Sequence, residues 1–296
     1  MVRVNCKHVE RFGKQYFDIN GDRAEAYVKS TYVAHFGLEP YYIALLWNMI
    51  DKTVSPLKNT NHLKYFMLSL MFLRTYATNI VLATKVGVDP ATSARWIWKF
   101  LERLALLPVI KWENRLISDN GSRCKVTLDG TDFRINEQHP FSSRWFTKKF
   151  KSAGLRYEVA TAIQTGHIVW INGPFPCGEW PDLKIAMSSF VDCLEGDERA
   201  VADSGYRGHP EFFDTPWKHL DNDQQRRRKA LARARHETVN RRFKKWEALH
   251  GIWRHPLQKH GVAFHAVANI EQVLIEKKRN VFQVEYNDRI GNEFDY

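Results

Sequence analysis

The chain has 296 residues, of which 44% are apolar and 26% charged, and these proportions argue against disorder over its whole length. Lysine and arginine number 44 against 33 acids, so the formal net charge is +11 and the surface should attract a polyanion such as nucleic acid or an acidic lipid. No apolar run approaches the roughly 20 residues of a membrane span, and the start, MVRVNCKHVERFGK, lacks the apolar core of a signal peptide. We therefore expect a soluble intracellular protein without membrane contact.

The cysteines and histidines do not form a metal-binding pattern. The four cysteines are widely separated and include no C-x-x-C pair, which argues against both a disulfide scaffold and a structural zinc site. Four histidines recur at steps of five residues, but each such step turns the side chain by about 140° on a helix, so they would not converge on one ion. These are His250, His255, His260 and His265.

Residues 1–117 are expected to form a helical domain, because apolar residues recur there at helical spacing and strand signals are sparse. Within this domain, residues 79–105 have the pattern of a helix-turn-helix. A short apolar helix begins at Asn79, a turn follows at Gly87, and a second helix has Asp89 as its N-cap and Pro90 in its first position.

The second helix of this motif has an inward apolar stripe and a polar face that includes Arg95 and Lys99. These two side chains are candidates to contact DNA in a major groove. The alternative is an ordinary helical hairpin with a solvated basic side, and the sequence does not choose between the two.

After Pro108 the sequence changes character, and we predict an α/β domain over residues 118–296. The expected elements are a strand at KVTLDGTDFRI, a hairpin of YEVATAIQTG and HIVWINGPF joined at Gly166, a helix from Asp182, a short strand RAVAD, and helices over 223–250 and 264–278. Strands that come first and helices that cover them predict a mixed sheet flanked by helices.

A basic stretch lies within the first of those long helices. Between Arg226 and Lys245 it carries ten basic residues and one acid, Glu237. Such a run is ordinarily a solvated helix face, while its RRRK segment also has the composition of a nuclear import signal. We accordingly expect the protein in the nucleus.

Three acids stand out by position: Asp129 midway along a strand, Asp203 at the end of another, and Glu237 on the basic helix. Each has an ordinary explanation, since Asp129 could be an edge charge, Asp203 could start a turn, and Glu237 could pair with Arg233 and Arg241. Exposed pairs of that kind contribute only about 0.3–0.5 kcal/mol each. The functional reading of Glu237 is a metal-binding carboxylate on a helix face that receives phosphates.

Four segments in this order resemble the Harbinger-type DDE transposases, also described as DDE superfamily endonucleases. LDGTDFRI resembles the strand with the family's first aspartate, and KKFKSAGLRYEVATAIQ the lysine-bearing hairpin that follows it. ADSGYRG resembles the strand with the second aspartate, and ARHETVNRRFKKW the helix with the glutamate. The separation of 34 residues between Asp203 and Glu237 also agrees with the family's pattern.

The resemblance implies an RNase H-like fold in which Asp129, Asp203 and Glu237 form a catalytic triad. Three carboxylates at one place repel one another unless cations neutralise them, so two Mg²⁺ or Mn²⁺ ions are expected there. Asp132 is the alternative to Asp129 as the first acid of the triad. It lies an odd number of residues from Asp129 along the strand, so its side chain should face the other side of the sheet. Asp182 matches the family only as an acid, and we interpret it as a helix N-cap.

The expected activity is metal-dependent cleavage and rejoining of DNA phosphodiesters at transposon ends. Five basic side chains would neutralise the DNA backbone, so that binding weakens as salt rises: Lys148, Lys149, Lys151, Arg241 and Lys244. The resemblance also implies several copies of the chain on DNA and a separate Myb-like DNA-binding partner. The alternatives are a domesticated, catalytically silent DNA-binding protein and a cellular RNase H-like nuclease.

Overall fold

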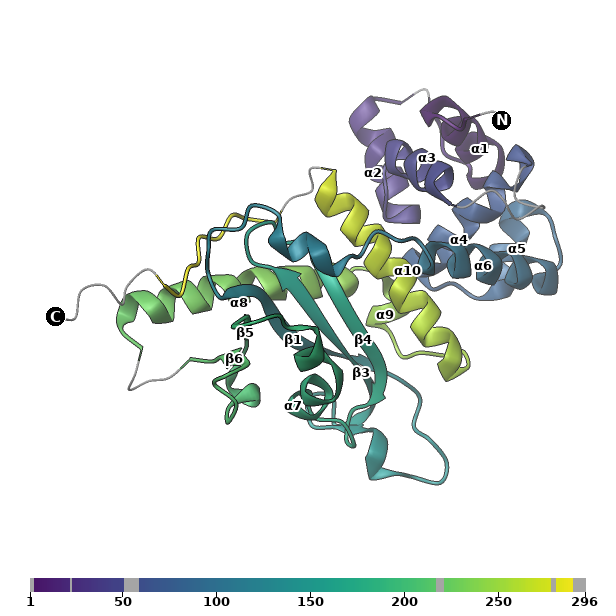
Figure 1. Cartoon of the computed structure of the whole chain (residues 1–296). Helices are drawn as coiled ribbons and strands as arrows, with labels where there is room; N and C mark the ends of the chain where they lie inside the picture. Colours follow the sequence, from purple (N-terminus) through teal and green to yellow (C-terminus); the bar gives the residue numbers. More distant parts are fainter. Residues whose placement is uncertain (1–2, 22, 51–58, 217–220, 278–280, 290–296) are drawn as a thin grey trace. The chain divides into compact units, whose positions relative to one another are not determined.

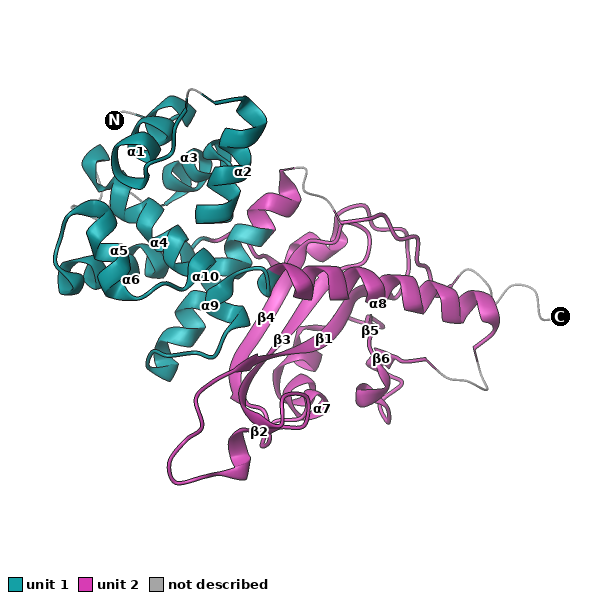
Figure 2. Ribbon diagram, turned by 180° about the vertical axis from the view of Figure 1, so that it is seen from behind, with its two compact units in different colours: residues 1–107, 243–271 teal, residues 108–242, 272–296 magenta. Residues whose placement is uncertain are grey.

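The computed structural model describes residues 3–21, 23–50, 59–216, 221–277 and 281–289 (Figure 1). The chain forms two compact units, one of Met1–Leu107 with Phe243–Glu271 and the other of Pro108–Arg242 with Gln272–Tyr296 (Figure 2). Both units join segments that are distant in the sequence. The domain boundary near residue 117 stays a prediction beside this division.

The first unit is built from helices. Helix α4 (Leu63–Thr75) is its most buried element, because all but one of the residues from Leu63 to Leu73 are buried. A helix that is apolar on every side has to be surrounded by others. The other helices are α1 (Cys6–Phe17), α2 (Glu25–Phe36), α3 (Pro40–Met49), α5 (Asn79–Val86), α6 (Pro90–Ala105), α9 (Glu247–His250) and, up to Glu271, α10 (Leu257–Glu276).

The residues predicted as a helix-turn-helix, 79–105, form two helices joined by a short turn. Helix α5 ends at Gly87, whose φ of 64° favours glycine. The Asp89 side chain accepts a hydrogen bond of 2.8 Å from the backbone N–H of Thr92, and Pro90 begins α6. The apolar side of α6 is buried and Arg95 is exposed. Contact of this motif with DNA stays a prediction.

The second unit contains a mixed six-stranded sheet. Strand β1 (Cys124–Arg134) pairs antiparallel with β3 (Ser152–Ala162) and parallel with β5 (Arg199–Val201). Strand β3 also pairs antiparallel with β2 (Phe146–Thr147) and β4 (Ile168–Pro176), and β5 pairs parallel with β6 (Phe213–Asp214). The strand order along the main path is β2-β3-β1-β5-β6. The mixed sheet and the hairpin turned at Gly166, where φ is 74°, agree with the sequence prediction.

The helices of this unit include α7 (Asp182–Ile185), which continues as helical turns through Ala186–Phe190 and Val191–Cys193, and α8 (Asp223–Phe243). The single helix predicted over 223–250 is wrong, because α8 ends at Phe243 and α9 begins at Glu247. Between them Trp246 has extended backbone, with φ −92° and ψ 114°, and its buried indole N–H donates to the Glu271 carboxylate at 2.9 Å.

Helix α10 begins at Leu257, directly after Pro256, whereas the sequence predicted a start near residue 264. Proline is favoured at the beginning of a helix because it has no N–H to leave unpaired there. None of the described helices is long and apolar enough to span a membrane.

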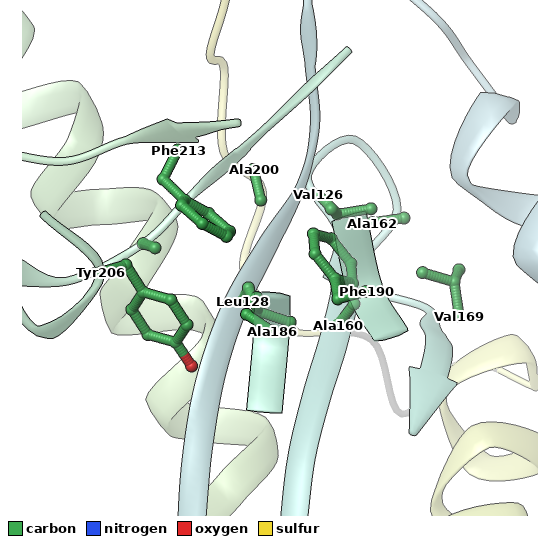
Figure 3. Packing of buried hydrophobic residues seen from close by; sticks show 11 residues of the cluster. Val126, Leu128, Ala160, Ala162, Val169, Ala186, Phe190, Ala200, Tyr206 and Phe213 are labelled. Carbon is green, nitrogen blue, oxygen red and sulfur yellow. The ribbon is translucent and has the colours of Figure 1, made fainter. Parts of the chain in front are cut away.

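Helices α7 and α8 cover opposite faces of the sheet. On one face Val126 and Leu128 of β1 pack with Phe190, and the rest of this core comes from β3, β4, β5, β6 and the turn after β5 (Figure 3). On the other face the hydroxyl of Thr127 lies 2.8 Å from Nδ1 of His236 on α8. Because successive side chains of a strand alternate between faces, β1 can present different chemistry to each helix.

Candidate active site

Sheet register brings Asp129 and Asp203 to the same level. Thr127 of β1 and Val201 of β5 are partners in a parallel pair, and each aspartate lies two residues beyond its partner residue. The pairing ends there, and the chain turns into a helical turn at Ser204–Tyr206. The Asp203 side chain caps this turn by accepting the N–H of Gly205 at 2.7 Å, so Asp203 does start a turn, as its ordinary explanation predicted.

Helix α8 brings Glu237 to the same place. The side-chain amide of Asn240, three residues after Glu237, donates to the Asp129 carboxylate at 3.0 Å. Asp129, Asp203 and Glu237 all line a cavity of ≈ 700 Å³ and an adjoining one of ≈ 260 Å³. The structure therefore brings together the three acids that the sequence predicted as a triad; their catalytic role stays a prediction.

Negative charge is concentrated in this cavity. Burial, together with the negative charges of Glu237, Asp182 and Asp203, raises the pKa of Asp129 to about 7. The pKa of Asp182 is also raised, mainly by burial and despite the opposing effect of Arg156. A carboxylate whose ionisation is opposed by its neighbours is stabilised when a cation lies between them.

The donor atoms fit a hard divalent ion, since carboxylate oxygens are the ligands that Mg²⁺ prefers. Among the described residues, however, no group of three or more His, Cys, Asp or Glu side chains is arranged so that it could hold a metal ion. Asp129, Asp203 and Glu237 would therefore have to turn toward a cation to bind it together.

Asp132 faces the other side of β1, as predicted. It is buried, and Arg156 donates two hydrogen bonds to it, from Nε at 2.7 Å and from Nη2 at 3.0 Å. The hydroxyl of Thr147 adds a third at 2.9 Å. Burial alone would raise the pKa of Asp132, but Arg156 and Thr147 hold it below its ordinary value. Asp132 is thus a structural partner of Arg156.

Asp182 is not the N-cap that the sequence predicted. Pro181 occupies the cap position of α7, and the Asp182 side chain makes no capping hydrogen bond. Its carboxylate lies over Gly130, the residue after Asp129, and lines the larger cavity with the predicted acids. Sequence reasoning missed this role because the contact joins residues 52 positions apart, and only the glycine beside Asp129 signals it.

His236 and Asn240 were also missed. His236 is 1% exposed, its Nδ1 lies 2.8 Å from the Thr127 hydroxyl and 3.2 Å from the Thr161 hydroxyl, and its Nε2 is buried without a partner. Burial lowers its pKa to about 3, so the ring is neutral. His236 lines the smaller cavity beside the acids. The spacing of Asn240 from Glu237 places both on one helix face, and this is the signal that could have pointed to Asn240.

The predicted DNA-binding lysines divide into two groups. Lys148 and Lys149 are exposed and line the larger cavity with the acids, whereas Lys151, in the turn between β2 and β3, lies outside the residues that line it. Arg241 is exposed on α8, four residues after Glu237. Lys244 follows the end of α8 and belongs to the first unit, so it does not lie on the helix that carries Glu237.

The other two predicted DNA contacts lie on α6 in the first unit. Arg95 is exposed, and the ammonium of Lys99 lies over the ring of Trp96, 5.0 Å from its centroid.

In comparisons with known proteins, no family model, no curated protein and no solved structure matches the chain. The geometry of the site is therefore the basis for the function proposed below.

Proposed function

We propose that the second unit is the catalytic domain of a metal-dependent DNA endonuclease of the DDE transposase type. The observation that carries this proposal is the meeting of Asp129, Asp203 and Glu237 around one cavity. These acids come from a central strand, the turn after its parallel neighbour and a distant helix. Three carboxylates in this relation are the residues expected to hold divalent cations for phosphodiester chemistry.

The strand order supports the same proposal. Strands β4, β3 and β1 are successive antiparallel neighbours, and β5 and β6 continue the sheet parallel to β1. Helices α7 and α8 follow β4 and β6 in the sequence and cover opposite faces. A sheet of this order, with acids at the end of the parallel pair, is what an RNase H-like domain requires.

The charges around the cavity also support the proposal, because acids and lysines line it together. Asp129, Asp203 and Glu237 would hold the divalent ions, and Lys148 and Lys149 would bind the DNA phosphates. Bound cations would relieve the repulsion between these acids and act as the Lewis acid for attack on the phosphodiester. The proposal includes cleavage and rejoining at transposon ends in the nucleus, with several copies on DNA and a Myb-like partner.

Nicking of a DNA duplex by the purified full chain in Mg²⁺ or Mn²⁺ at low salt tests this function. Asp203→Asn should abolish nicking, whereas Asp192→Asn, which changes an exposed acid outside the cavity, should leave it unchanged. Equal nicking by the wild type and Asp203→Asn would contradict the triad. DNA binding by both without any nicking would favour the silent DNA-binding protein, and preferential cutting of RNA–DNA hybrids would favour a cellular nuclease.

A further inference from the structure

We propose that Asp182 is a fourth carboxylate of this site and binds a divalent cation together with Asp129, Asp203 and Glu237. This inference rests on the proposed function and deepens it by enlarging the ligand set of the same site. It also replaces the interpretation of Asp182 as a helix cap.

The position of Asp182 depends on Gly130. A Cβ built on Gly130 would overlap Oδ1 of Asp182 and lie 2.9 Å from its Cγ, so the carboxylate occupies the space that a side chain at position 130 would take. Gly130 directly follows Asp129 in β1. The absence of a side chain here therefore lets an acid from α7 reach the strand beside the first acid of the predicted triad.

No local structural role explains the position of the Asp182 carboxylate. It makes no capping hydrogen bond to α7, and its Oδ1 is buried without a hydrogen-bond partner. Arg156 Nη1 lies 3.3 Å from that oxygen, but the same guanidinium already donates two hydrogen bonds to Asp132. One guanidinium facing two carboxylates leaves a negative charge uncompensated, which is costly for a partly buried group unless a cation is present.

A second observation points to a ligand beside the same three acids. The Nε2 atom of His236 is buried and unpaired, although Nδ1 of the same ring lies within hydrogen-bond distance of two threonine hydroxyls. The ring lines the cavity that adjoins the Asp182 cavity and shares Asp129, Asp203 and Glu237 with it. Buried polar atoms are almost always paired, so two orphaned atoms around one group of acids indicate that a polar ligand completes the site.

Binding of Mn²⁺ to the full chain without DNA, measured by electron paramagnetic resonance and calorimetry, tests the inference apart from catalysis. Asp182→Asn should weaken Mn²⁺ binding by about tenfold or more, Asp129→Asn should weaken it at least as much, and Asp192→Asn should not change it. Unchanged binding by Asp182→Asn, with binding lost in Asp129→Asn, would overturn the fourth ligand and leave the proposed function standing. No Mn²⁺ binding by the wild type would overturn both.

Gly130→Ala is the sharper variant because it keeps every carboxylate and displaces only Asp182. It should weaken Mn²⁺ binding as Asp182→Asn does, and the double variant should lose no more than either single one, because both changes act on the same contact. Thermal unfolding without metal shows that each variant is folded. Independent, additive losses would contradict the idea that Gly130 acts through Asp182.

Discussion

Two aspartates three residues apart on β1 have opposite electrostatic surroundings. Asp132 faces α7 and is neutralised by two hydrogen bonds from Arg156, which hold its pKa low. Asp129 faces α8, accepts one amide hydrogen bond from Asn240, and its pKa is raised to about 7 by burial and by neighbouring acids. The two residues have the same side chain on one strand, so the partners on each face decide whether the negative charge is neutralised.

The partners of each carboxylate indicate whether it serves the fold or is free to bind a cation. A buried carboxylate with a guanidinium partner needs nothing more, and its charge serves the fold. A carboxylate surrounded by other carboxylates is costly to ionise, so a cation beside it would stabilise its charged form. The two faces of β1 can therefore be tested against each other.

The largest expected contrast comes from the matched substitutions Asp129→Asn and Asp132→Asn. Loss of a metal-binding carboxylate removes several kcal/mol of transition-state stabilisation, so Asp129→Asn should reduce DNA nicking about a thousandfold while leaving the protein at least as stable as the wild type. Asp132→Asn removes the carboxylate that accepts two hydrogen bonds from the partly buried Arg156, and it should lower the free energy of unfolding by about 3 kcal/mol. Nicking assays and urea denaturation measure the two effects.

The assignments of the two faces would be exchanged if Asp132→Asn abolished nicking at unchanged stability and Asp129→Asn unfolded the protein. A loss of stability in both variants would mean that both aspartates serve the fold. Asp192→Asn, an exposed acid of the same unit, is the control for the general loss of one negative charge.

Two buried basic residues of α8, Lys229 and Arg235, also differ in the partners of their charged groups. The ammonium of Lys229 lies 2.7 Å from the Asp214 carboxylate and 2.8 Å from that of Asp221, whereas Arg235 is 2% exposed and donates to the backbone carbonyl of Ala162. Burial lowers the pKa of Arg235 to about 10. Lys229→Met should cost about 3 kcal/mol of stability, because two acids each lose an ion pair with a buried ammonium.

Arg235→Met should be neutral or stabilise the protein by about 1 kcal/mol, because methionine fills a similar volume without a buried charge. Urea denaturation of the two variants side by side measures both values. A loss from Arg235→Met equal to that from Lys229→Met would show that Arg235 has a structural role that its single backbone hydrogen bond does not explain.

Local patterns predicted most of the elements that position the site. The β-branched and aromatic residues of KVTLDGTDFRI and the turn at Gly166 predicted β1 and the hairpin, and the Asp89-Pro90 pair predicted the start of α6. These features are encoded within a few residues, so they can be read without the fold. Which acids would meet was implied by the resemblance of four segments to the DDE transposases.

What the sequence did not reveal depends on contacts between distant segments. The end of α8 follows from the burial of Trp246 against Glu271, and the two-residue strand β6 has meaning only beside β5. The place of Asp182 depends on the space above Gly130. Short strands and interior gaps carry no periodic signal, because the partner that defines them lies elsewhere in the chain.

A smaller effect is expected from an acid that is paired near the surface. Asp288 accepts hydrogen bonds from Ser122 and Arg123 and forms an ion pair with Arg199 at 3.1 Å. Together these contacts hold the segment 281–289 against β1 and β5. Burial would raise the pKa of Asp288, but these partners lower it to about 2. The stabilisation should therefore be complete above about pH 4 and disappear as the pH falls through 2.

Asp288→Asn should lower the free energy of unfolding by about 1 kcal/mol at neutral pH, since the ion pairs are partly screened by solvent. The difference between variant and wild type should shrink between pH 4 and 2, which thermal unfolding as a function of pH measures. A difference that is constant over this range would mean that the loss comes from packing and not from the charge of Asp288.

The smallest expected effects concern the lysines beside the acids. If Lys148 and Lys149 bind DNA phosphates, the double substitution by alanine should weaken DNA binding several-fold and lower the slope of log affinity against log salt by about 2. Lys29→Ala, which removes an exposed lysine paired with Glu25 in the other unit, should leave the slope unchanged. Fluorescence anisotropy with a duplex at several salt concentrations measures each slope. An unchanged slope for the double variant, with a lower slope for Arg95→Ala and Lys99→Ala, would place the DNA contact on α6 and not at the acidic cavity. Each lost phosphate contact lowers the number of counterions released on binding, at whichever site the contact lies.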